Sequence, residues 1–246
     1  MFLKIRPLID SLVFLTSLEV IVLKAKFVFL IAIFLLLFSL YEGRKIGGRW
    51  FFSILPTFFV VSSVALLYLI GLLYEQQIFI VLSAGMYYLS LLSADRLGQY
   101  DGDQTAKGMN MAAASATIFF TYASAYGLYL NFLVPLYHLM LVYLIVTLLV
   151  SFQYFVIIKK NQRRIVWMYS FLLALIMAEI VWTMNYWPFG YLTTGVIALI
   201  LYYVLWDLTQ SYFLNLLSKK RVVANMVFFS SLIAVVLLSA KWIPVI

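Results

Sequence analysis

Long apolar runs separated by short polar loops constrain this chain more than any other feature. The run from Ile165 to Trp187 has about 23 residues, enough at ~1.5 Å per residue to cross a hydrocarbon layer of ~30 Å. Hydrophobic residues make up 66% of the chain and charged residues 11%, whereas soluble domains carry about 25% charged residues. The sequence therefore predicts an all-α polytopic transmembrane helix bundle with about eight spans.

The whole chain, residues 1–246, is predicted to be a single integral membrane domain, with the bundle formed by residues 25–241. Pro56 is expected to kink or break the start of the second span. Pro135 lies at the first turn of the fifth span, where proline is favoured, and Glu75-Gln76-Gln77 is predicted to be a tight turn. The expected spans are residues 25–41, 51–74, 78–94, 109–130, 135–159, 165–187, 189–214 and 222–240.

The segment before the first span, residues 1–24, is predicted to hold an amphipathic helix at the membrane interface. Arg6 and Asp10 lie near one side of that helix, and apolar residues lie on the others. Asp10 and Glu19 make the stretch a poor span. They also interrupt what would otherwise resemble a signal peptide, so the segment is expected to be retained. In the alternative interpretation residues 7–23 cross the membrane, which gives nine spans.

Basic residues alternate between the loops in a regular way. The loops at 42–50, 95–108, 159–164 and 219–221 hold 3, 2, 4 and 3 Lys or Arg residues, and those at 75–77, 131–133 and 186–190 hold none. Cytoplasmic loops carry an excess of Lys and Arg. The four basic loops are therefore predicted to be cytoplasmic, and the C-terminus to lie outside.

Glu179 is the only acid in the middle of the 165–187 run, about 12 Å below its outer end by helical rise. An ionised carboxylate at this depth costs roughly 2.5 kcal/mol or more, so it needs a partner or a proton. At helical spacing it shares a face with Trp182, Thr183 and Tyr186. One hypothesis is a carboxylate that carries a proton or binds a cation. The other is a protonated side chain that only holds helices together.

Two more titratable side chains fall within predicted spans. His138 lies near the outer end of the fifth span, where it could relay protons to Glu179. It could equally bond a carbonyl or a lipid headgroup at the interface. Asp207, near the inner end of the seventh span, could continue a polar path inward, or could form a structural ion pair with Lys219 or Lys220.

Asp101 and Asp103 lie one residue apart in the longest polar loop. Two such carboxylates can hold Mg²⁺ or Ca²⁺ and present a phosphate-bearing substrate at the membrane face. The alternative is a solvated turn without a ligand. No cofactor is predicted.

The residue counts exclude several classes of site. There is no Cys, which rules out disulfides and thiolate chemistry, and a single His makes a multi-His metal site untenable. The net charge of +8 comes from Lys and Arg clustered in short loops, so no nucleic-acid partner is expected. The predicted partners are the lipid bilayer and other membrane proteins.

The overall layout and the run from Ala178 to Gly190 resemble those of uncharacterised bacterial multi-pass membrane proteins of unknown function. This resemblance implies a bacterial cytoplasmic (inner) membrane and no particular activity. Three hypotheses follow for function. The chain is a structural or assembly protein without turnover, a small proton-coupled transporter or permease that uses Glu179, or a lipid-modifying enzyme that uses Asp101 and Asp103.

Overall fold

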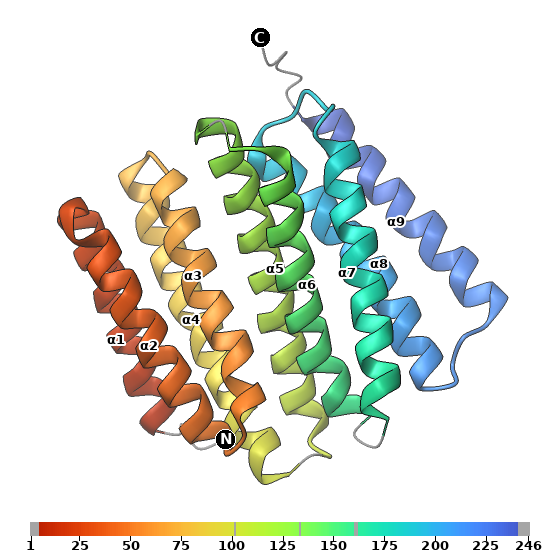
Figure 1. The fold of residues 1–246 in the computed structure, drawn as a ribbon, viewed down its shortest axis with the longest axis horizontal. Helices are drawn as coiled ribbons and strands as arrows, with labels where there is room; N and C mark the ends of the chain where they lie inside the picture. Colours follow the sequence, from red (N-terminus) through yellow and green to blue (C-terminus); the bar gives the residue numbers. More distant parts are fainter. Residues whose placement is uncertain (1–4, 101, 133, 160–161, 241–246) are drawn as a thin grey trace. The chain divides into compact units, whose positions relative to one another are not determined.

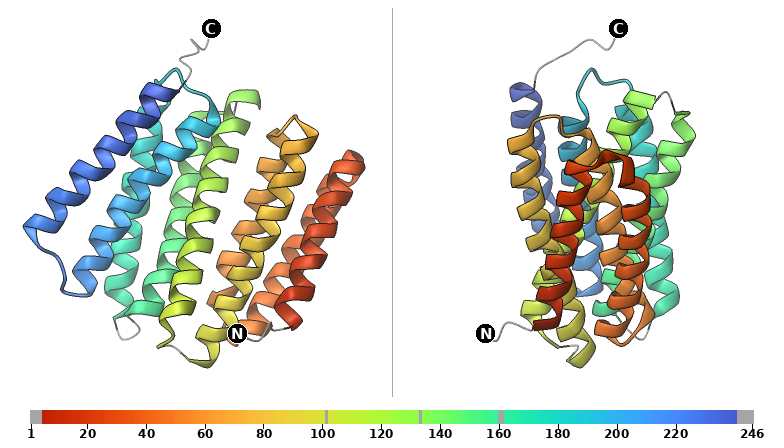
Figure 2. Two further views of the ribbon diagram at one scale, coloured as in Figure 1. Left: turned by 180° about the vertical axis from the view of Figure 1, so that it is seen from behind. Right: turned by 90° about the vertical axis from the view of Figure 1, so that its left-hand side faces the viewer.

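In the computed structural model, residues 5–100, 102–132, 134–159 and 162–240 are described, and they form α-helices joined by short connections. The all-α prediction is confirmed. The chain folds as two compact units, residues 1–121 and 122–246. The boundary falls within α5 (Gln104–Phe132). Within each unit the helices run side by side in alternating directions (Figures 1 and 2).

The first unit contains α1 (Ile5–Leu23), α2 (Val28–Gly47), α3 (Ile54–Leu69), α4 (Leu73–Gln99) and the first part of α5. α1 packs lengthwise on α4 and also contacts α2. The C-terminal ends of α2 and α4 approach each other closely. A Cβ atom added to Gly98 would lie only 2.7 Å from the carbonyl oxygen of Gly47, so the close approach requires glycine at position 98. Near this end α1 and α2 bring charged side chains together.

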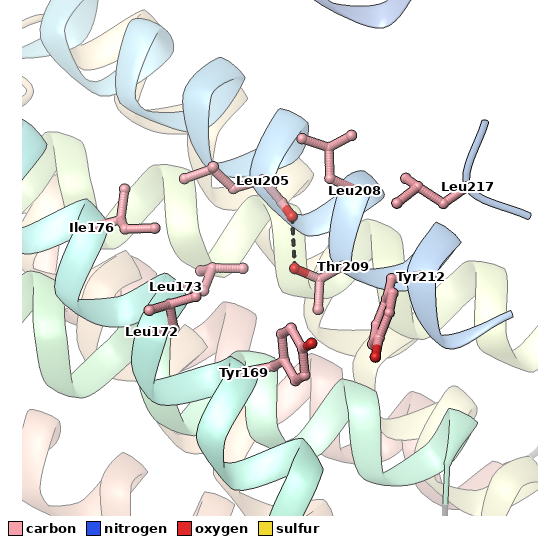
Figure 3. Close-up of a pocket in the computed structure, with 9 residues that line it drawn as sticks. All are labelled: Tyr169, Leu172, Leu173, Ile176, Leu205, Leu208, Thr209, Tyr212 and Leu217. Carbon is pink, nitrogen blue, oxygen red and sulfur yellow. Dashed lines mark hydrogen bonds between the residues drawn. The ribbon is translucent and has the colours of Figure 1, made fainter. Parts of the chain in front are cut away.

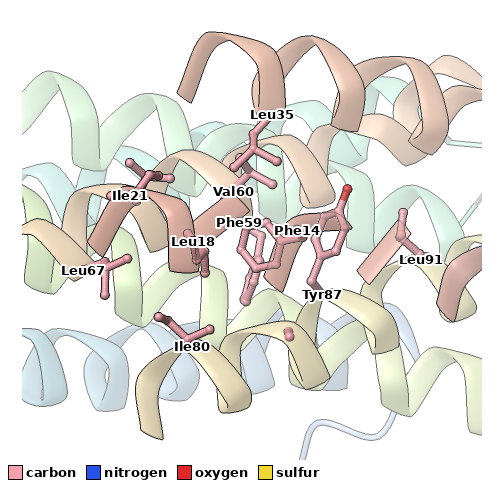
Figure 4. Close-up of a cluster of buried hydrophobic side chains, with 12 residues drawn as sticks. Phe14, Leu18, Ile21, Leu35, Phe59, Val60, Leu67, Ile80, Tyr87 and Leu91 are labelled. Carbon is pink, nitrogen blue, oxygen red and sulfur yellow. The ribbon is translucent and has the colours of Figure 1, made fainter. Parts of the chain in front are cut away.

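The core of the first unit is an apolar cluster to which α1 contributes Phe14, Leu18 and Ile21 (Figure 4). The ring of Phe14 lies 4.6 Å from that of Tyr87 and 6.1 Å from that of Phe59, centroid to centroid. α1 is therefore an integral part of this unit and is held by its large buried side chains.

The second unit contains the rest of α5, then α6 (Leu136–Ile158), α7 (Arg163–Met184), α8 (Tyr191–Phe213) and α9 (Lys219–Ser239). Buried hydroxyl groups connect α5 and α6. The Tyr122 and Thr147 hydroxyls are 2.5 Å apart, and the Tyr143 hydroxyl donates to the Tyr122 carbonyl at 3.1 Å. The Tyr122 and Tyr143 rings also stack at 3.9 Å. Such interhelical hydrogen bonds hold helices together in an apolar medium.

Six helices in the described part of the chain are long and apolar enough to cross a membrane. They are Trp50–Leu69, Leu73–Gln99, Leu136–Ile158, Arg163–Met184, Tyr191–Phe213 and Lys219–Ser239. The predicted count of eight spans is not confirmed. α2 falls outside the six because Glu42, Arg44 and Lys45 lie in its last turns, and α5 because it is rich in Ser, Thr and Tyr.

Two segments predicted to be loops are largely helical. Glu75-Gln76-Gln77 is not a turn, because the chain turns at residues 70–72 and α4 already begins at Leu73. The side chain of Gln76 donates to the Ile70 carbonyl at 2.7 Å and so fixes that turn. The loop predicted at 95–108 is also mostly helical, since α4 ends at Gln99 and α5 begins at Gln104.

Candidate functional site

The most unusual polar site in the described residues lies where α1, α2 and α4 meet in the first unit. Arg6 on α1 donates from Nη2 and Nε to the same oxygen of Glu42 on α2, at 2.7 and 3.1 Å. The Glu42 side chain is 10% exposed and that of Arg6 44%. This ion pair therefore has a buried carboxylate and a half-exposed guanidinium, and it stands near the ends of both helices.

Asp10 lies one turn further along α1 than Arg6 and is only 6% exposed. Its Oδ2 atom is buried and has no hydrogen-bond partner among the described residues. The charged groups that act on it are Glu42, Arg6 and Lys45. Arg6 binds Glu42 directly, so the cation nearest to Asp10 along α1 is already shared with a second buried acid.

Two hydroxyl groups continue this site into the unit. Tyr87 on α4 and Ser39 on α2 are fully buried, and neither hydroxyl has a hydrogen-bond partner of ordinary geometry among the described residues. The polar groups that influence the Tyr87 hydroxyl are Ser39, Asp10 and Glu42. By helical rise Tyr87 is about 18 Å from the end of α4, and the Phe14 ring packs against its own ring (Figure 4).

The arrangement has a clear chemical consequence. Burying a polar atom without a partner costs free energy, and burying an uncompensated charge costs much more. Asp10 can avoid that cost by taking up a proton or by holding a cation. The described residues contain no group of three or more His, Cys, Asp or Glu side chains placed to hold a metal ion. Uptake of a proton by Asp10 needs no further ligand.

Glu179 is not in a comparable site. It lies on an exposed face of α7 and makes no hydrogen bond or ion pair with any other described residue. Its predicted neighbours are exposed as well. The Trp182 and Tyr186 rings meet edge to face at 6.1 Å, and the Thr183 hydroxyl donates to the Ile180 carbonyl of the same helix at 2.7 Å.

His138 is exposed in the first turn of α6, with its ring 4.1 Å from that of Tyr137. Within the described residues no hydrogen bond or ion pair joins it to Glu179. Asp207 on α8 accepts from Arg221 at 3.2 Å and from Asn225 at 2.6 Å. The expected structural ion pair is therefore present, although its cation is Arg221 and not Lys219 or Lys220.

Asp103 caps α5 and pairs with α4. Its Oδ1 atom accepts the backbone N–H of Ala106 at 3.0 Å, and its Oδ2 atom lies 2.6 Å from Nη2 of Arg96. The backbone N–H of Ala106 above all, and then the Arg96 guanidinium, hold the pKa of Asp103 below its usual value. Asp101, the other proposed metal ligand, lies outside the described residues. With both Asp103 oxygens engaged, the metal hypothesis has no structural observation in its favour.

Sequence reasoning missed the site on α1, α2 and α4. Asp10 carries a signal, since it is an acid within an apolar stretch, but in the sequence it argues only that residues 7–23 are a poor span. Glu42 falls in a predicted cytoplasmic loop, whereas it belongs to the last turns of α2. Ser39 and Tyr87 are 48 positions apart, and no local pattern predicts their contact.

The fold is that of an all-helical protein with several helices apolar enough to be embedded in a membrane. The chain belongs to the DUF5656 family, described as a protein of unknown function, whose model matches residues 35–239. This match confirms the resemblance to an uncharacterised family. No curated protein and no solved structure matches the chain.

Proposed function

We propose that this chain is a multi-pass integral membrane protein in which α1 crosses the bilayer as a ninth span. The packing of α1 along α4 supports this alternative over a helix lying flat at the interface. Phe14 and Leu18 are fully buried in the first unit, whereas a helix at the membrane interface would turn its apolar face to acyl chains.

The number of spans decides on which side the N-terminus lies: eight spans put it outside, and nine put it on the cytoplasmic side. With nine spans, Arg6 lies on the same side as the basic loop at 42–50, in agreement with the excess of cations on cytoplasmic loops. Lys24 and Lys26 remain on the opposite side, against that rule. The C-terminus is outside, and the membrane is the cytoplasmic membrane of a bacterium.

The function that the geometry supports best is that of a proton- or cation-coupled carrier. The observation that carries it is the buried Oδ2 atom of Asp10, which lies beside the Arg6–Glu42 pair and has no hydrogen-bond partner within the described part of the chain. A carboxylate inside a bundle that can take and release an ion is the usual basis of such coupling. The packed rings of Phe14, Phe59 and Tyr87 lie deeper in the unit, so under this proposal an ion reaches Asp10 from the Arg6 end.

The test compares wild type with Asp10→Asn in nanodiscs between pH 5 and 9. Deprotonation puts a negative charge on a buried carboxyl group beside the Glu42 carboxylate, so the wild type should lose stability as the pH rises, and Asp10→Asn should not. Glu179→Gln is the matched control, since it also removes one intramembrane acid, and it should keep the wild-type pH profile. Identical pH profiles of stability for wild type and Asp10→Asn would contradict the proposal that Asp10 takes up an ion.

Coupling needs a second measurement. On a solid-supported membrane, a pH jump should displace charge in proteoliposomes with wild type and with Glu179→Gln, and not with Asp10→Asn. A wild type that shows pH-dependent stability but no charge displacement would mean that Asp10 binds a proton without moving it. That result would exclude the carrier.

A structural or assembly role is the second candidate, and the exposure of Glu179 favours it. A carboxylate on an apolar helix face that meets lipid is costly, and a polar side chain of a neighbouring membrane protein would remove that cost. Under this proposal Glu179→Gln weakens co-purification with a partner and leaves the pH-jump current unchanged.

A further inference from the structure

A groove on the second unit is lined by α7, α8 and the segment that leads into α9 (Figure 3). Its volume is about 260 Å³. Six of its nine lining residues are Leu or Ile, and the other three carry hydroxyl groups. The apolar residues are Leu172, Leu173, Ile176, Leu205, Leu208 and Leu217, and the hydroxyl residues are Tyr169, Thr209 and Tyr212.

The two ends of the groove differ in polarity. Tyr169 lies about two turns from the start of α7, and Tyr212 lies in the last turn of α8. Their rings are 5.2 Å apart and face one another (Figure 3). Ile176 and Leu205 lie deeper along the same helices. The groove therefore has a phenolic end near the connections between helices and an apolar end further in.

Basic residues lie at the helix ends next to the phenolic end. The Nζ atom of Lys159 lies 5.3 Å from the centre of the Phe213 ring, and that ring meets Tyr169 edge to face at 5.3 Å. Arg163 and Arg164 begin α7, and Lys219 and Lys220 begin α9. None of these five side chains is ion-paired with an acid in the described part of the chain. The sequence has no Asp or Glu in residues 159–164 or 214–221. Arg221 is paired with Asp207, so the excess positive charge at this end comes from the five other cations.

We propose that this groove binds one anionic phospholipid, with an acyl chain along its leucines and the phosphate among Lys219, Lys220 and the neighbouring cations. Basic pockets between transmembrane helices on the cytoplasmic side have the chemistry that such headgroups require. The excess of cations selects an anionic over a zwitterionic headgroup. The site lies in the second unit and is independent of Asp10.

The test is native mass spectrometry of the detergent-solubilised protein with equal amounts of phosphatidylglycerol and phosphatidylcholine. Wild type should retain phosphatidylglycerol in preference. Each Lys near an anionic surface is worth roughly fivefold in binding, so the double variant Lys219→Gln/Lys220→Gln should lose about 25-fold of that preference. The variant Lys24→Gln/Lys26→Gln removes the same charge from the other unit and should behave like wild type.

A groove-filling variant distinguishes the contribution of the acyl chain to lipid binding from that of the headgroup. Leu205→Trp should reduce retention of both lipids and leave their ratio unchanged, whereas the lysine variant should change the ratio. The melting temperature of each variant without added lipid shows whether it is folded. Equal retention of the two lipids by wild type, or equal losses in the two double-lysine variants, would overturn the proposal.

Discussion

The burial of Phe14 gives the sharpest test of the role of α1. Its side chain is 0% exposed and packs against Tyr87 and Phe59 in the core of the first unit. Phe14→Ala removes the ring and leaves a hole bordered by helices that cannot close it without moving. The substitution should therefore destabilise the unit, although it touches no charged residue.

The expected loss in the free energy of unfolding depends on which interactions of the Phe14 ring are absent in the variant. In water-soluble cores Phe→Ala costs about 3–5 kcal/mol, part of which is the transfer of the side chain from water. In a bilayer the separated helix exposes Phe14 to acyl chains that are as apolar as the core, so only the loss of packing remains. With ~24 cal/mol per Å³ and a cavity of roughly 100 Å³, the expected loss is about 2 kcal/mol.

The assay is unfolding in mixed micelles by increasing fractions of sodium dodecyl sulfate, followed by circular dichroism. Leu12→Ala is the matched control, because Leu12 lies on the same helix and is 51% exposed; it should cost less than about 0.5 kcal/mol. If α1 lay flat on the membrane surface, the two variants would have similar small effects. Equal effects of Phe14→Ala and Leu12→Ala would refute the integration of α1.

Two further predictions concern close packing and pH. Gly195→Ala places a Cβ atom 2.8 Å from that of Ala123. It should lower the free energy of unfolding by about 1–3 kcal/mol in the same assay. The control Gly85→Ala has open space around its added Cβ atom and should leave the free energy of unfolding unchanged. The pKa of Asp103 is lowered in the folded chain, so its stabilising effect is present above its unfolded pKa and is lost as the pH falls through the folded value. Melting curves should therefore separate wild type from Asp103→Asn at pH 7 and converge toward pH 3, and a constant separation would contradict this.

Most of the helices could be predicted from apolar runs alone, and the errors lie at their ends. Glu75, Gln76 and Gln77 predict a turn because they are polar, but an acid in the first turn of a helix is favourable. The first turn of α5 is also polar, but it is helical, and Asp103 caps it by accepting the backbone N–H of Ala106. Polarity marks where a helix leaves the apolar layer, and a helix can continue beyond that point.

The candidate site could not be predicted because depth along a helix is a poor measure of burial. Glu179 is in the middle of its helix, yet it points to an exposed face. Asp10 is near the beginning of α1, yet it is buried because α2 and α4 cover it. Which face of an apolar helix meets protein depends on contacts such as Arg6 with Glu42, which are 36 positions apart.

The family match gives this site a further significance. Ser39, Glu42 and Tyr87 lie within the matched residues 35–239, whereas Arg6 and Asp10 precede them. The matched region therefore supplies a buried acid and two buried hydroxyls. α1 supplies the cation that pairs with that acid and a second buried acid, Asp10, whose Oδ2 atom has no hydrogen-bond partner among the described residues. Without α1, Glu42 would lose Arg6, and Tyr87 would lose the Phe14 ring that covers it. The polar and the apolar contacts of α1 thus depend on the same placement of the helix. The stability of Phe14→Ala tests the apolar contacts of that placement, and the pH response of Asp10→Asn tests the polar ones.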